Sequence, residues 1–376
     1  MSSWTANVLS ALIISIVLTG ILIPQILLIA FRKQLFDVPD ERKIHKGVVP
    51  RLGGIAFMPS IFLSIACITG VNYALFNGEV FLSLAHSVLP VSFGMCAVMM
   101  MYLVGMADDL IGVRYSAKFV VQIIAGVFIA ASGLLIDNLH GFLGIHTLYP
   151  AIAWILTILV VVFIVNAVNL IDGIDGLCSG LCGIALLFYG LVYLTSGDYT
   201  YSLIAFAGLG TLVPFFYYNV FGDARVGTKI FMGDTGALTT GISLCILSLR
   251  MCTLEQVGEI SVNPIVLAFA PLIIPCFDVF RVYLHRLKRH ANPFLPDKSH
   301  IHHKLLALGM KQRYAMITIL LVSAVFIVSN ALLSPYINVT WLVIIDIVVW
   351  VVVNMIITRA IRKREKRLNL DKPLYE

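Results

Sequence analysis

Long apolar runs separated by short polar segments are the dominant pattern along this chain. Each run has roughly 17–25 residues, the length that an α-helix needs to cross the hydrocarbon core of a bilayer. Backbone polar groups in lipid must be paired within the segment, so helices are the expected form. The pattern predicts an all-α polytopic membrane protein with about 11 transmembrane helices, at residues 7–31, 52–71, 86–106, 118–137, 150–168, 177–196, 201–220, 236–252, 263–283, 314–334 and 340–358.

Composition extends this picture to the whole chain. Of the 376 residues, 60% are hydrophobic and 12% are charged, and the mean hydropathy of +0.96 excludes an ordinary soluble domain. The first run lacks the basic leader and the small-residue cleavage site of a signal peptide, so we expect a helix there. Without repeats or linkers, the chain is predicted to be a single integral membrane domain at 1–358 with a basic cytoplasmic tail at 359–376.

Lysine and arginine predict the orientation, because cytoplasmic loops carry the excess of positive charge. Only Arg250 lies on the opposite face; the other 25 of the 26 Lys and Arg residues lie in segments 32–51, 107–118, 221–229, 281–313 and 359–372. The N-terminus is therefore predicted outside and the C-terminus in the cytoplasm. The net charge of +6 is then explained by the membrane, with the tail held against anionic lipid, and no nucleic-acid partner is expected.

The cysteines and one isolated acid carry little functional signal. All seven cysteines are scattered through apolar runs without a CxxC pair, so we expect small core residues and neither disulfides nor a zinc site. Asp346 stands alone in the last run, where it either pairs with a polar group of a neighbouring helix or has a function of its own.

Four polar clusters lie on the predicted cytoplasmic face, and the first is the pair Asp108 and Asp109. Adjacent like charges at a helix end repel unless a cation or strong donors compensate. On a helix their side chains diverge by about 100°, which predicts different partners for them. Arg114 and Lys118 follow closely, so a solvated loop with internal salt bridges is the alternative.

The second cluster is the segment NAVNLIDGIDGL at 166–177, directly after a strongly apolar run. It places Asn166, Asn169, Asp172 and Asp175 three residues apart, close to lipid, where a carboxylate is costly without a partner. Its two glycines permit tight turns and a close approach of a ligand to the backbone. A glycine-capped helix end would account for one exposed acid, but not for four polar groups.

The third cluster is Lys229-Ile-Phe-Met-Gly-Asp234-Thr-Gly236, before an apolar run. Asp234 could simply cap the following helix. A helix N-terminus flanked by glycines is also suited to phosphate or metal-phosphate binding. Asn219, at the end of the preceding run, is close enough to join this cluster.

The fourth cluster is the histidine segment His300-Ile-His302-His303 in the longest cytoplasmic loop. We expect a short helix capped by Asp297 or Ser299 and closed by Gly309. On that helix His300 and His303 would share a face, with His302 pointing elsewhere. Zinc binding is the alternative, but regularly spaced Cys or acidic ligands are missing.

Carboxylates, glycine-flanked helix ends, lysines and histidines at headgroup depth fit magnesium-assisted phosphoryl or phosphosugar transfer. Mg²⁺ prefers one or two carboxylates together with phosphate oxygens, and basic side chains neutralise a diphosphate. A site at this depth allows one substrate to be a lipid and the other a cytosolic nucleotide.

The four motifs, in order, together with the segment from Asp37 to Gly54, resemble the bacterial polyprenyl-phosphate N-acetylhexosamine-1-phosphate transferases. These belong to the glycosyltransferase 4 family and are related to the phospho-N-acetylmuramoyl-pentapeptide translocases. The resemblance covers nearly the whole chain. It implies a catalytic membrane domain at 1–358 in the bacterial inner membrane, with the active site on the cytoplasmic face.

The resemblance also implies the reaction and its partners. A UDP-N-acetylhexosamine would donate sugar 1-phosphate to undecaprenyl phosphate, releasing UMP, with Mg²⁺ (Mn²⁺ as a substitute) as cofactor and a homodimer as a common assembly. Catalytic roles would fall to Asp108, Asp109, Asp172 and Asp175, and the metal to Asp234 and Asp109. Substrate contacts would come from Arg51, Lys118, Asn166, Asn169, Asn219, Phe231, His300, His302 and His303.

The HIHH form of the last motif is similar to the branch that uses UDP-N-acetylglucosamine, whereas the muramoyl-pentapeptide branch carries a plain histidine triplet. Products of the favoured branch begin envelope glycans such as O-antigen. Two rivals differ in class. A secondary transporter would place its acids near the bilayer midplane in repeated halves. A CDP-alcohol phosphatidyltransferase would need Ala-Arg where this chain has Ser179-Gly180.

Overall fold

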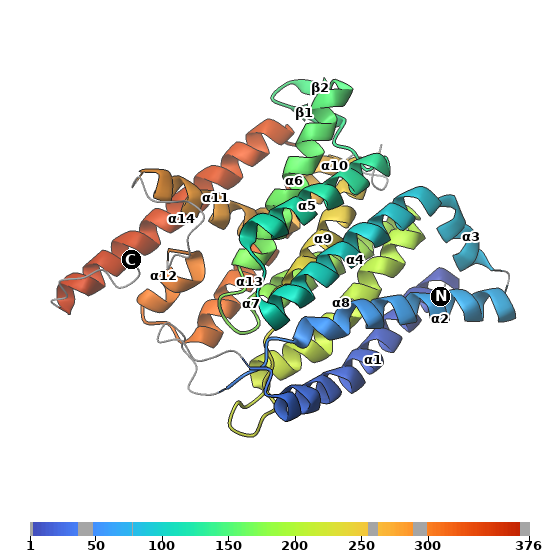
Figure 1. Cartoon of the computed structure of the whole chain (residues 1–376). Helices are drawn as coiled ribbons and strands as arrows, with labels where there is room; N and C mark the ends of the chain where they lie inside the picture. Colours follow the sequence, from blue (N-terminus) through green and yellow to red (C-terminus); the bar gives the residue numbers. More distant parts are fainter. Residues whose placement is uncertain (1–2, 37–47, 77, 255–261, 289–298, 369–376) are drawn as a thin grey trace.

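The computed structural model is a bundle of long helices with one small β-hairpin (Figure 1). It describes residues 3–36, 48–76, 78–254, 262–288 and 299–368. The first half contains α1 (Ser3–Lys33), the 3₁₀ turn η1 (Gly53–Ala56), α2 (Phe57–Leu75), α3 (Glu79–His86), α4 (Val88–Ile111), α5 (Tyr115–Ala131), β1 (Asn138–Phe142), β2 (Ile145–Thr147) and α6 (Pro150–Leu170). The second half contains α7 (Leu177–Ser196), α8 (Tyr199–Phe221), α9 (Gly233–Cys252), α10 (Pro264–Phe269), η2 (Ala270–Leu272), α11 (Ile273–Lys288), α12 (Ile301–Ala307), α13 (Gln312–Leu333) and α14 (Val339–Arg367).

The predicted membrane spans are found as helices. Within the described residues, ten helical segments are long and apolar enough to cross a membrane, and α5 is a shorter apolar helix. The prediction of a span at 118–137 was too long at its end, because the chain leaves the helix at Ser132 and Gly133 adopts a left-handed φ of +89°. The chain is therefore an all-α polytopic membrane protein, as predicted.

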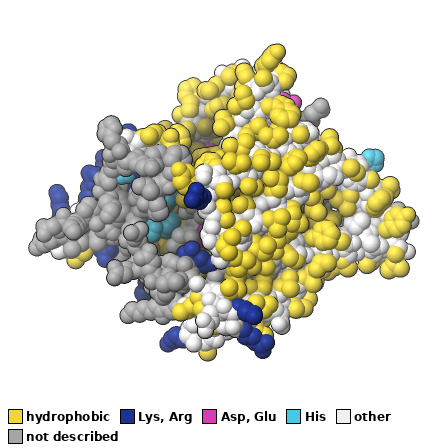
Figure 2. Space-filling view, viewed as in Figure 1, with side chains coloured by type: hydrophobic (Ala, Val, Ile, Leu, Met, Phe, Trp, Pro, Cys, Tyr) yellow, Lys and Arg dark blue, Asp and Glu magenta, His cyan; other side chains and the backbone are white. Residues whose placement is uncertain are grey.

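The outer surface of the bundle is suited to lipid. Figure 2 shows one face covered by hydrophobic side chains, with Lys and Arg at its margins. Large apolar side chains are more than half exposed along α1, α4 and α14, for example Ile13 (58%), Leu89 (54%) and Val348 (54%). In water such a surface would drive aggregation, so its natural surroundings are hydrocarbon.

The central helix is α9, which carries Asp234 at its first turn. It is the most buried of the candidate membrane spans in the described residues, although it is also the least apolar of them. Small residues explain this, because they let neighbouring backbones approach closely. At Gly241 an added Cβ would lie only 3.2 Å from the Cα of Val165 on α6. A small, weakly apolar helix thus lies at the centre and positions Asp234.

The chain before α2 is fastened to the start of α9. Gly53 N–H donates to the Phe231 carbonyl (3.0 Å), and Phe231 N–H donates to the Pro50 carbonyl (2.9 Å). Gly54 lies against Gly236, where a Cβ would come within 2.0 Å of the Gly236 nitrogen. This close approach brings the segment containing Arg51 next to Asp234.

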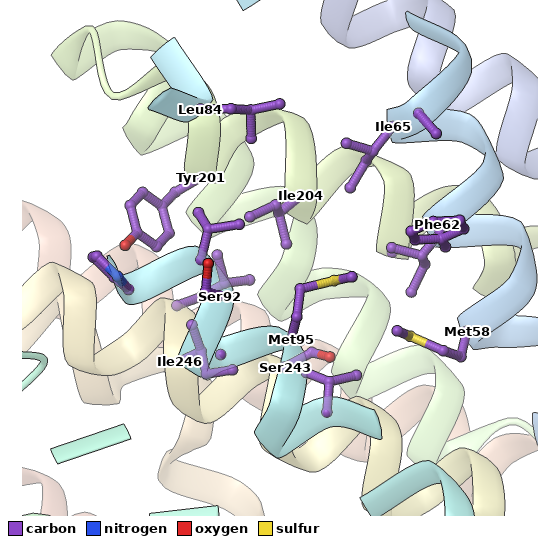
Figure 3. A pocket seen from close by; sticks show the side chains of 18 of the residues that line it. Met58, Phe62, Ile65, Leu84, Ser92, Met95, Tyr201, Ile204, Ser243 and Ile246 are labelled. Atoms are coloured by element: carbon purple, nitrogen blue, oxygen red, sulfur yellow. The ribbon is translucent and has the colours of Figure 1, made fainter. Parts of the chain in front are cut away.

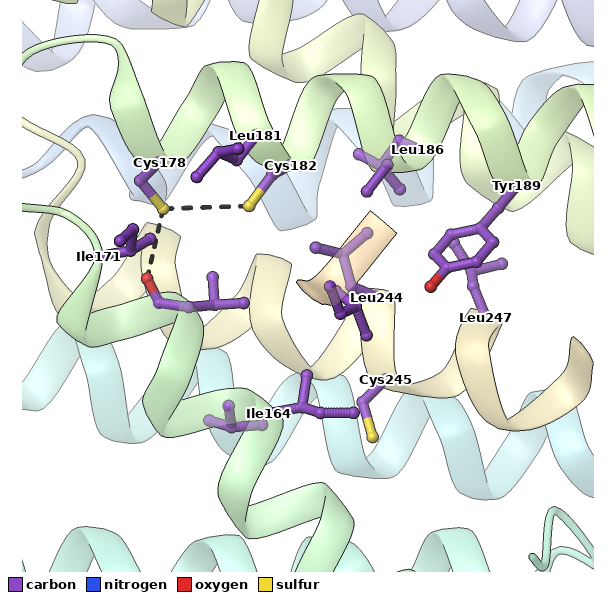
Figure 4. Packing of buried hydrophobic residues seen from close by; sticks show 14 of the residues in the cluster. Ile164, Ile171, Cys178, Leu181, Cys182, Leu186, Tyr189, Leu244, Cys245 and Leu247 are labelled. Carbon is purple, nitrogen blue, oxygen red and sulfur yellow. Dashed lines mark hydrogen bonds between the residues drawn. The ribbon is translucent and has the colours of Figure 1, made fainter. Parts of the chain in front are cut away.

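The cysteine prediction is confirmed in part. All seven cysteines are free, and Cys178 and Cys182 of α7 are buried in the core with 3.9 Å between their sulfurs (Figure 4). Cys67 and Cys96, however, are exposed on the surface of the bundle. The prediction of a core position was wrong there, because an apolar run is compatible with either a buried or a lipid-facing residue.

A cavity of about 670 Å³ lies between α2, α4, α8 and α9 (Figure 3). Phe62 and Ile65 of α2 face Met95 of α4 across it, and nearly all of its wall is apolar. The Tyr201 hydroxyl, at its wall, has no hydrogen-bond partner among the described residues. Such a wall is matched to hydrocarbon and offers no charge to a phosphate, so the polar site lies elsewhere.

Three local features were not predicted. The residues after α5 form an antiparallel hairpin in which Asn138 pairs with Thr147 and Phe142 with Ile145. The run predicted at 263–283 is divided at η2, where Pro271 interrupts the helix. The predicted boundary at 358 lies inside α14, which continues as a helix to Arg367.

The isolated acid of the last span has a neighbouring partner. Asp346 of α14 is 5% exposed and hydrogen-bonded to Asn330 of α13. This contact accounts for a carboxyl at membrane depth through helix–helix pairing, the first of its two interpretations.

Candidate functional site

The four polar clusters meet at one end of the bundle. Lys118 of α5 contacts acids from two clusters, and Asn169 of α6 reaches the Asp234 carboxylate. A turn beside Asp172 lies against the histidine segment. Residues more than 120 positions apart in the sequence therefore line one site, as the interpretation of a shared site requires.

Asp109, at the end of α4, holds the N-terminus of α9. Its carboxylate accepts the backbone N–H groups of Asp234 (2.8 Å) and Thr235 (2.8 Å) and the Thr235 hydroxyl (2.5 Å). Free N–H groups and the helix dipole make this end of α9 electropositive, so a carboxylate is stabilised there. The backbone must also come close: at Gly233 (φ +70°) a Cβ would meet the Asp109 carboxylate at 2.5 Å. Asp109 thus positions the residue beside it on α9.

Lys118 bridges Asp108, predicted to be catalytic, and Asp234, predicted to bind the metal. Its ammonium lies 2.7 Å from Asp234 Oδ2 and 3.3 Å from Asp108 Oδ2. The other Asp108 oxygen accepts the Val113 backbone N–H (2.8 Å), which fixes the turn after α4. Asn169 donates to the same Asp234 oxygen (3.3 Å). One lysine between two half-buried carboxylates leaves net negative charge, which a cation can relieve.

Asp172 adds to this negative charge from the turn between α6 and α7. Lost hydration beside the surrounding protein, together with the nearby carboxylates of Asp175 and Asp234, raises the pKa of its carboxyl to about 7, against an opposing contribution from Arg51. A carboxyl whose pKa is raised by lost hydration and by like charges is typical of a functional position. The Asp172 side chain is exposed, so a ligand can reach it.

Asp175, in the same turn, points to the third cluster. Its carboxylate pairs with the Lys229 ammonium at 2.5 Å, and this ammonium lies 5.9 Å from the Phe231 ring centroid. Asn219 of α8 joins the two segments, because its side chain accepts the Gly176 N–H (2.6 Å) and donates to the Ile230 carbonyl (2.9 Å). Asp175, Lys229 and Phe231 thus form one wall, with Asn219 bracing it from behind.

Asn166 lies apart from these contacts. Its amide exchanges hydrogen bonds with Gln122 of α5 at 2.6 and 3.3 Å, and donates to the Val162 carbonyl at 2.7 Å. Its role in the structure is to join α5 to α6. The predicted substrate contact of Asn166 has no counterpart among these hydrogen bonds.

The histidine helix α12 is held at its start by Asp278 of α11, which the sequence analysis missed. Asp278 is fully buried and accepts the His300 ring nitrogen (2.9 Å) and the Ile301 N–H (3.0 Å). Arg281 pairs with it at 2.8 Å and also donates to the Ser299 carbonyl. The acid within the predicted span 263–283 was the available signal, since a buried charge implies a partner.

The N-cap of α12 also differs from the expected one. The N-cap residue is His300, whose side chain makes no cap bond, so the prediction of Ser299 as a side-chain cap was wrong. Asp297 lies outside the described residues. The expected closure by Gly309 agrees with the structure, in which Gly309 has a φ of +90° and its N–H donates to the Leu306 carbonyl.

His302 packs between the other two histidines and does not point away from them. Its ring is stacked with His300 (centroids 5.7 Å apart) and tilted against His303 (4.3 Å). The helical-wheel expectation was wrong because His300 precedes the helix and has an extended backbone. His302 is 1% exposed, and neither of its ring nitrogens has a hydrogen-bond partner among the residues that the structure describes.

Gly173 makes room for His302. A Cβ on Gly173 would lie 2.0 Å from the His302 Nε2, so only glycine fits between the acidic turn and this imidazole. Burial, helped by the neighbouring His303 and His300, lowers the pKa of His302 to about 3. A neutral imidazole with two unpartnered nitrogens, beside Asp172, is prepared to accept or donate a hydrogen bond to a bound ligand.

The carboxylates of the site fit a cation that is coordinated partly by the protein and partly by a bound ligand. Among the described residues no group of three His, Cys, Asp or Glu side chains could enclose a metal ion. Mg²⁺ does not need such a cage, because it is usually held by one or two carboxylates, waters and substrate phosphates. Asp234, at a glycine-flanked helix start with Asp172 near it, supplies that number of carboxylates.

Comparisons with known proteins give one family. A model described as Glycosyl transferase family 4 matches residues 91–252. The chain is 31% identical over 355 residues to the probable undecaprenyl-phosphate N-acetylglucosaminyl 1-phosphate transferase of Bacillus subtilis, covering 94% of this chain and 92% of that protein. It is 28% identical over 298 residues to the undecaprenyl-phosphate alpha-N-acetylglucosaminyl 1-phosphate transferase of Yersinia pestis, covering 79% and 76%. The Escherichia coli K12 protein of that name is 25% identical over 310 residues, covering 82% and 78%.

Proposed function

Because this chain belongs to glycosyl transferase family 4, we propose that it is an undecaprenyl-phosphate N-acetylglucosamine-1-phosphate transferase. It transfers N-acetylglucosamine 1-phosphate from UDP-N-acetylglucosamine to undecaprenyl phosphate and releases UMP. The relatives' names supply the acceptor and the sugar phosphate, and the donor is the nucleotide that would carry that sugar phosphate. The product is the first lipid-linked intermediate of an envelope glycan.

One observation in the structure supports this reaction above others: the convergence of Asp108, Lys118 and Asn169 on Asp234. Phosphoryl transfer needs positioning and neutralisation of charge more than covalent chemistry by the protein. A lysine between two carboxylates, next to an electropositive helix start, provides both. A transporter site near the midplane would not need this arrangement at the ends of the helices.

Mg²⁺ is the proposed cofactor, with Mn²⁺ as a substitute. Asp234 would hold it, with Asp172 as a further carboxylate close by, and the cation would neutralise the donor diphosphate and the departing phosphate. The raised pKa of Asp172 supports this assignment, since unrelieved negative charge is part of its cause. Asp109 would act indirectly, by holding the start of α9, because its oxygens already accept three hydrogen bonds from that helix end.

The proposed chemistry is a single displacement. An oxygen of the lipid phosphate bonds to the β-phosphorus of the donor as the bond from that phosphorus to the bridging oxygen breaks, and UMP leaves. The second pKa of a phosphate monoester is about 6, so the acceptor needs little help from a base at neutral pH. Asp108 is engaged by Lys118 and by the Val113 N–H, which suits a residue that positions the lysine more than a nucleophile.

The donor would lie across the second, third and fourth clusters. Phe231 and the wall formed by Asp175 and Lys229 offer a ring surface and charged edges for the uracil or ribose. His302 and His303, across Gly173, would face the diphosphate or the sugar. This arrangement places the reacting phosphates beside Asp234.

The orientation is part of the proposal. The distribution of Lys and Arg supports a cytoplasmic site, where UDP-sugars are made, in the inner membrane of a bacterium. The N-terminus would then be outside. The homodimer implied by the family resemblance stays a prediction.

The test is to incubate the purified protein with undecaprenyl phosphate, Mg²⁺ and a panel of UDP-sugars, and to measure UMP. We expect UMP release with UDP-N-acetylglucosamine that requires the lipid phosphate and stops on chelation. Turnover only with UDP-N-acetylmuramoyl-pentapeptide would instead assign the peptidoglycan branch. Flux of substrate across vesicles without UMP release would refute the enzyme and favour a transporter.

A further inference from the structure

The histidine helix α12 is too short to be stable alone. It has seven residues, whereas isolated helices below about 12–15 residues are marginal in water. Its position must therefore come from its neighbours. Asp278 of α11 holds the start of the helix through the Ile301 N–H, and further polar contacts come from α14.

The end of α12 is capped by a residue of that basic segment. Arg364 Nη1 donates to the Ala307 carbonyl at 2.7 Å. A cation at a helix C-terminus satisfies a free carbonyl and complements the helix dipole. Ile361, one turn earlier on α14 and fully buried, packs on Ala307. At Gly309 an added Cβ would meet the Arg364 guanidinium at 2.7 Å, so the chain turns tightly around this side chain.

A second contact fixes the middle of α12. Lys304 follows His303 directly and is only 5% exposed. Its ammonium donates to Thr358 Oγ1 (3.0 Å) and Asn354 Oδ1 (3.3 Å) of α14. A buried lysine that is satisfied by neutral acceptors on one helix fixes the distance between the two helices. Figure 1 shows α12 beside α14, as these contacts require.

The other basic residues of this segment behave differently. Arg362, Lys363, Lys366 and Arg367 are exposed, whereas Arg364 is half-buried against α12. Charge for anionic lipid can come from any of the exposed ones. The cap on Ala307 can come only from Arg364 among these five side chains, because it is the one that lies against α12.

We propose that Arg364 and Lys304 are positioning residues, through which the cytoplasmic extension of α14 holds the histidine helix in register with the donor site. This rests on the proposed function for the identity of the donor. Neither residue needs to touch a substrate. Loss of either contact would let His302 and His303 shift relative to Gly173, so the side chains proposed to face the donor would bind it less tightly.

The experiment compares Arg364→Ala with Lys363→Ala, which removes the same charge from the adjacent, exposed position. Arg364→Lys keeps the charge and can still donate to a carbonyl. Lys304→Met removes the donor of the second contact, and Thr358→Val removes one of its two acceptors. For each variant the donor KM, the acceptor KM and kcat are measured in the UMP assay, and hydrogen–deuterium exchange is followed in the peptide that contains α12.

We expect Arg364→Ala and Lys304→Met to raise the donor KM by about tenfold, with the acceptor KM unchanged and faster exchange in α12. Thr358→Val should show a smaller effect of the same kind. Lys363→Ala should match the wild type, and Arg364→Lys should lie between wild type and Arg364→Ala. Partial loss of folded protein would instead lower apparent kcat and leave both KM values unchanged.

Equal behaviour of Arg364→Ala and Lys363→Ala, in kinetics and in exchange, would overturn the proposal and leave lipid binding as the role of the segment. A fall in kcat alone would overturn it too. Absence of UMP release by the wild type would refute the proposed donor, and the exchange measurement, which needs no substrate, would then decide whether Arg364 holds α12.

Discussion

The carboxylate of Asp109 accepts the backbone N–H of Asp234 at 2.8 Å, which joins the end of α4 to the start of α9. These two acids were predicted from the sequence as joint metal ligands. The structure gives them different positions: Asp109 braces a helix end, and Asp234 faces Lys118 and Asn169. This difference leads to separate expectations for the two residues.

Asp234→Asn should reduce kcat for UMP release by about 100- to 1000-fold, because it removes the charge that would hold the cation at the reacting phosphates. Asp223→Asn is the matched control, since Asp223 is a surface carboxylate that pairs with Arg225. Undiminished turnover in Asp234→Asn would refute the metal assignment.

Asp109→Ala should lower the free energy of unfolding by about 1–2 kcal/mol, the usual effect of losing a carboxylate cap at a helix start. Activity should fall as well, since Asp234 is held by the same hydrogen bond. Thermal melting of the purified protein and the UMP assay measure the two effects. Wild-type melting together with lost activity would mean that Asp109 acts in the chemistry and not through α9.

Gly173→Ala should reduce activity by about 100-fold, because the new methyl would displace the His302 ring. Gly70→Ala on α2 is the control, since nothing lies within 4 Å of a Cβ there. Full activity in Gly173→Ala would show that the position of His302 does not matter for turnover.

Lowering the pH should destabilise the folded protein because His302 is buried in its neutral form. Burial lowers its pKa from 6.5 to about 3, so between these pH values the unfolded chain binds a proton that the folded chain does not. The contribution to stability is complete above pH 6.5 and is lost as the pH falls towards 3. His302→Gln should therefore reduce the loss of melting temperature between pH 7 and pH 4, measured by thermal denaturation. An equal reduction in His146→Gln, which changes an exposed histidine, would contradict this origin.

The sequence predicted the helices well because hydrophobic length is a strong constraint in a bilayer. It predicted the four clusters because polar groups stand out against apolar runs. The failures have a different cause. Asp278 was missed because its partners at His300 and Ile301 lie more than 20 residues away, and only tertiary structure joins them. The cap at Ser299 and the direction of His302 were wrong because a helical wheel says nothing about residues before the helix.

The end of α14 could not be predicted from hydropathy either. Hydropathy places a boundary at 358, but the basic residues that follow are good helix formers, so α14 does not end there. The sequence could indicate that Arg364 is charged. It could not indicate that the guanidinium would reach a carbonyl of α12 more than 50 residues earlier in the chain.

Because Asp278 holds the start of α12 and Arg364 holds its end, the position of α12 depends on two other helices. The two anchors belong to α11 and α14, which both cross the bilayer, and a change in hydrocarbon thickness alters the tilt of such helices. Any difference in tilt between them moves the histidines relative to Gly173. Turnover is therefore expected to depend on the acyl-chain length of the lipid. It should be highest at the bilayer thickness at which the tilts of α11 and α14 keep the histidines in place beside Gly173.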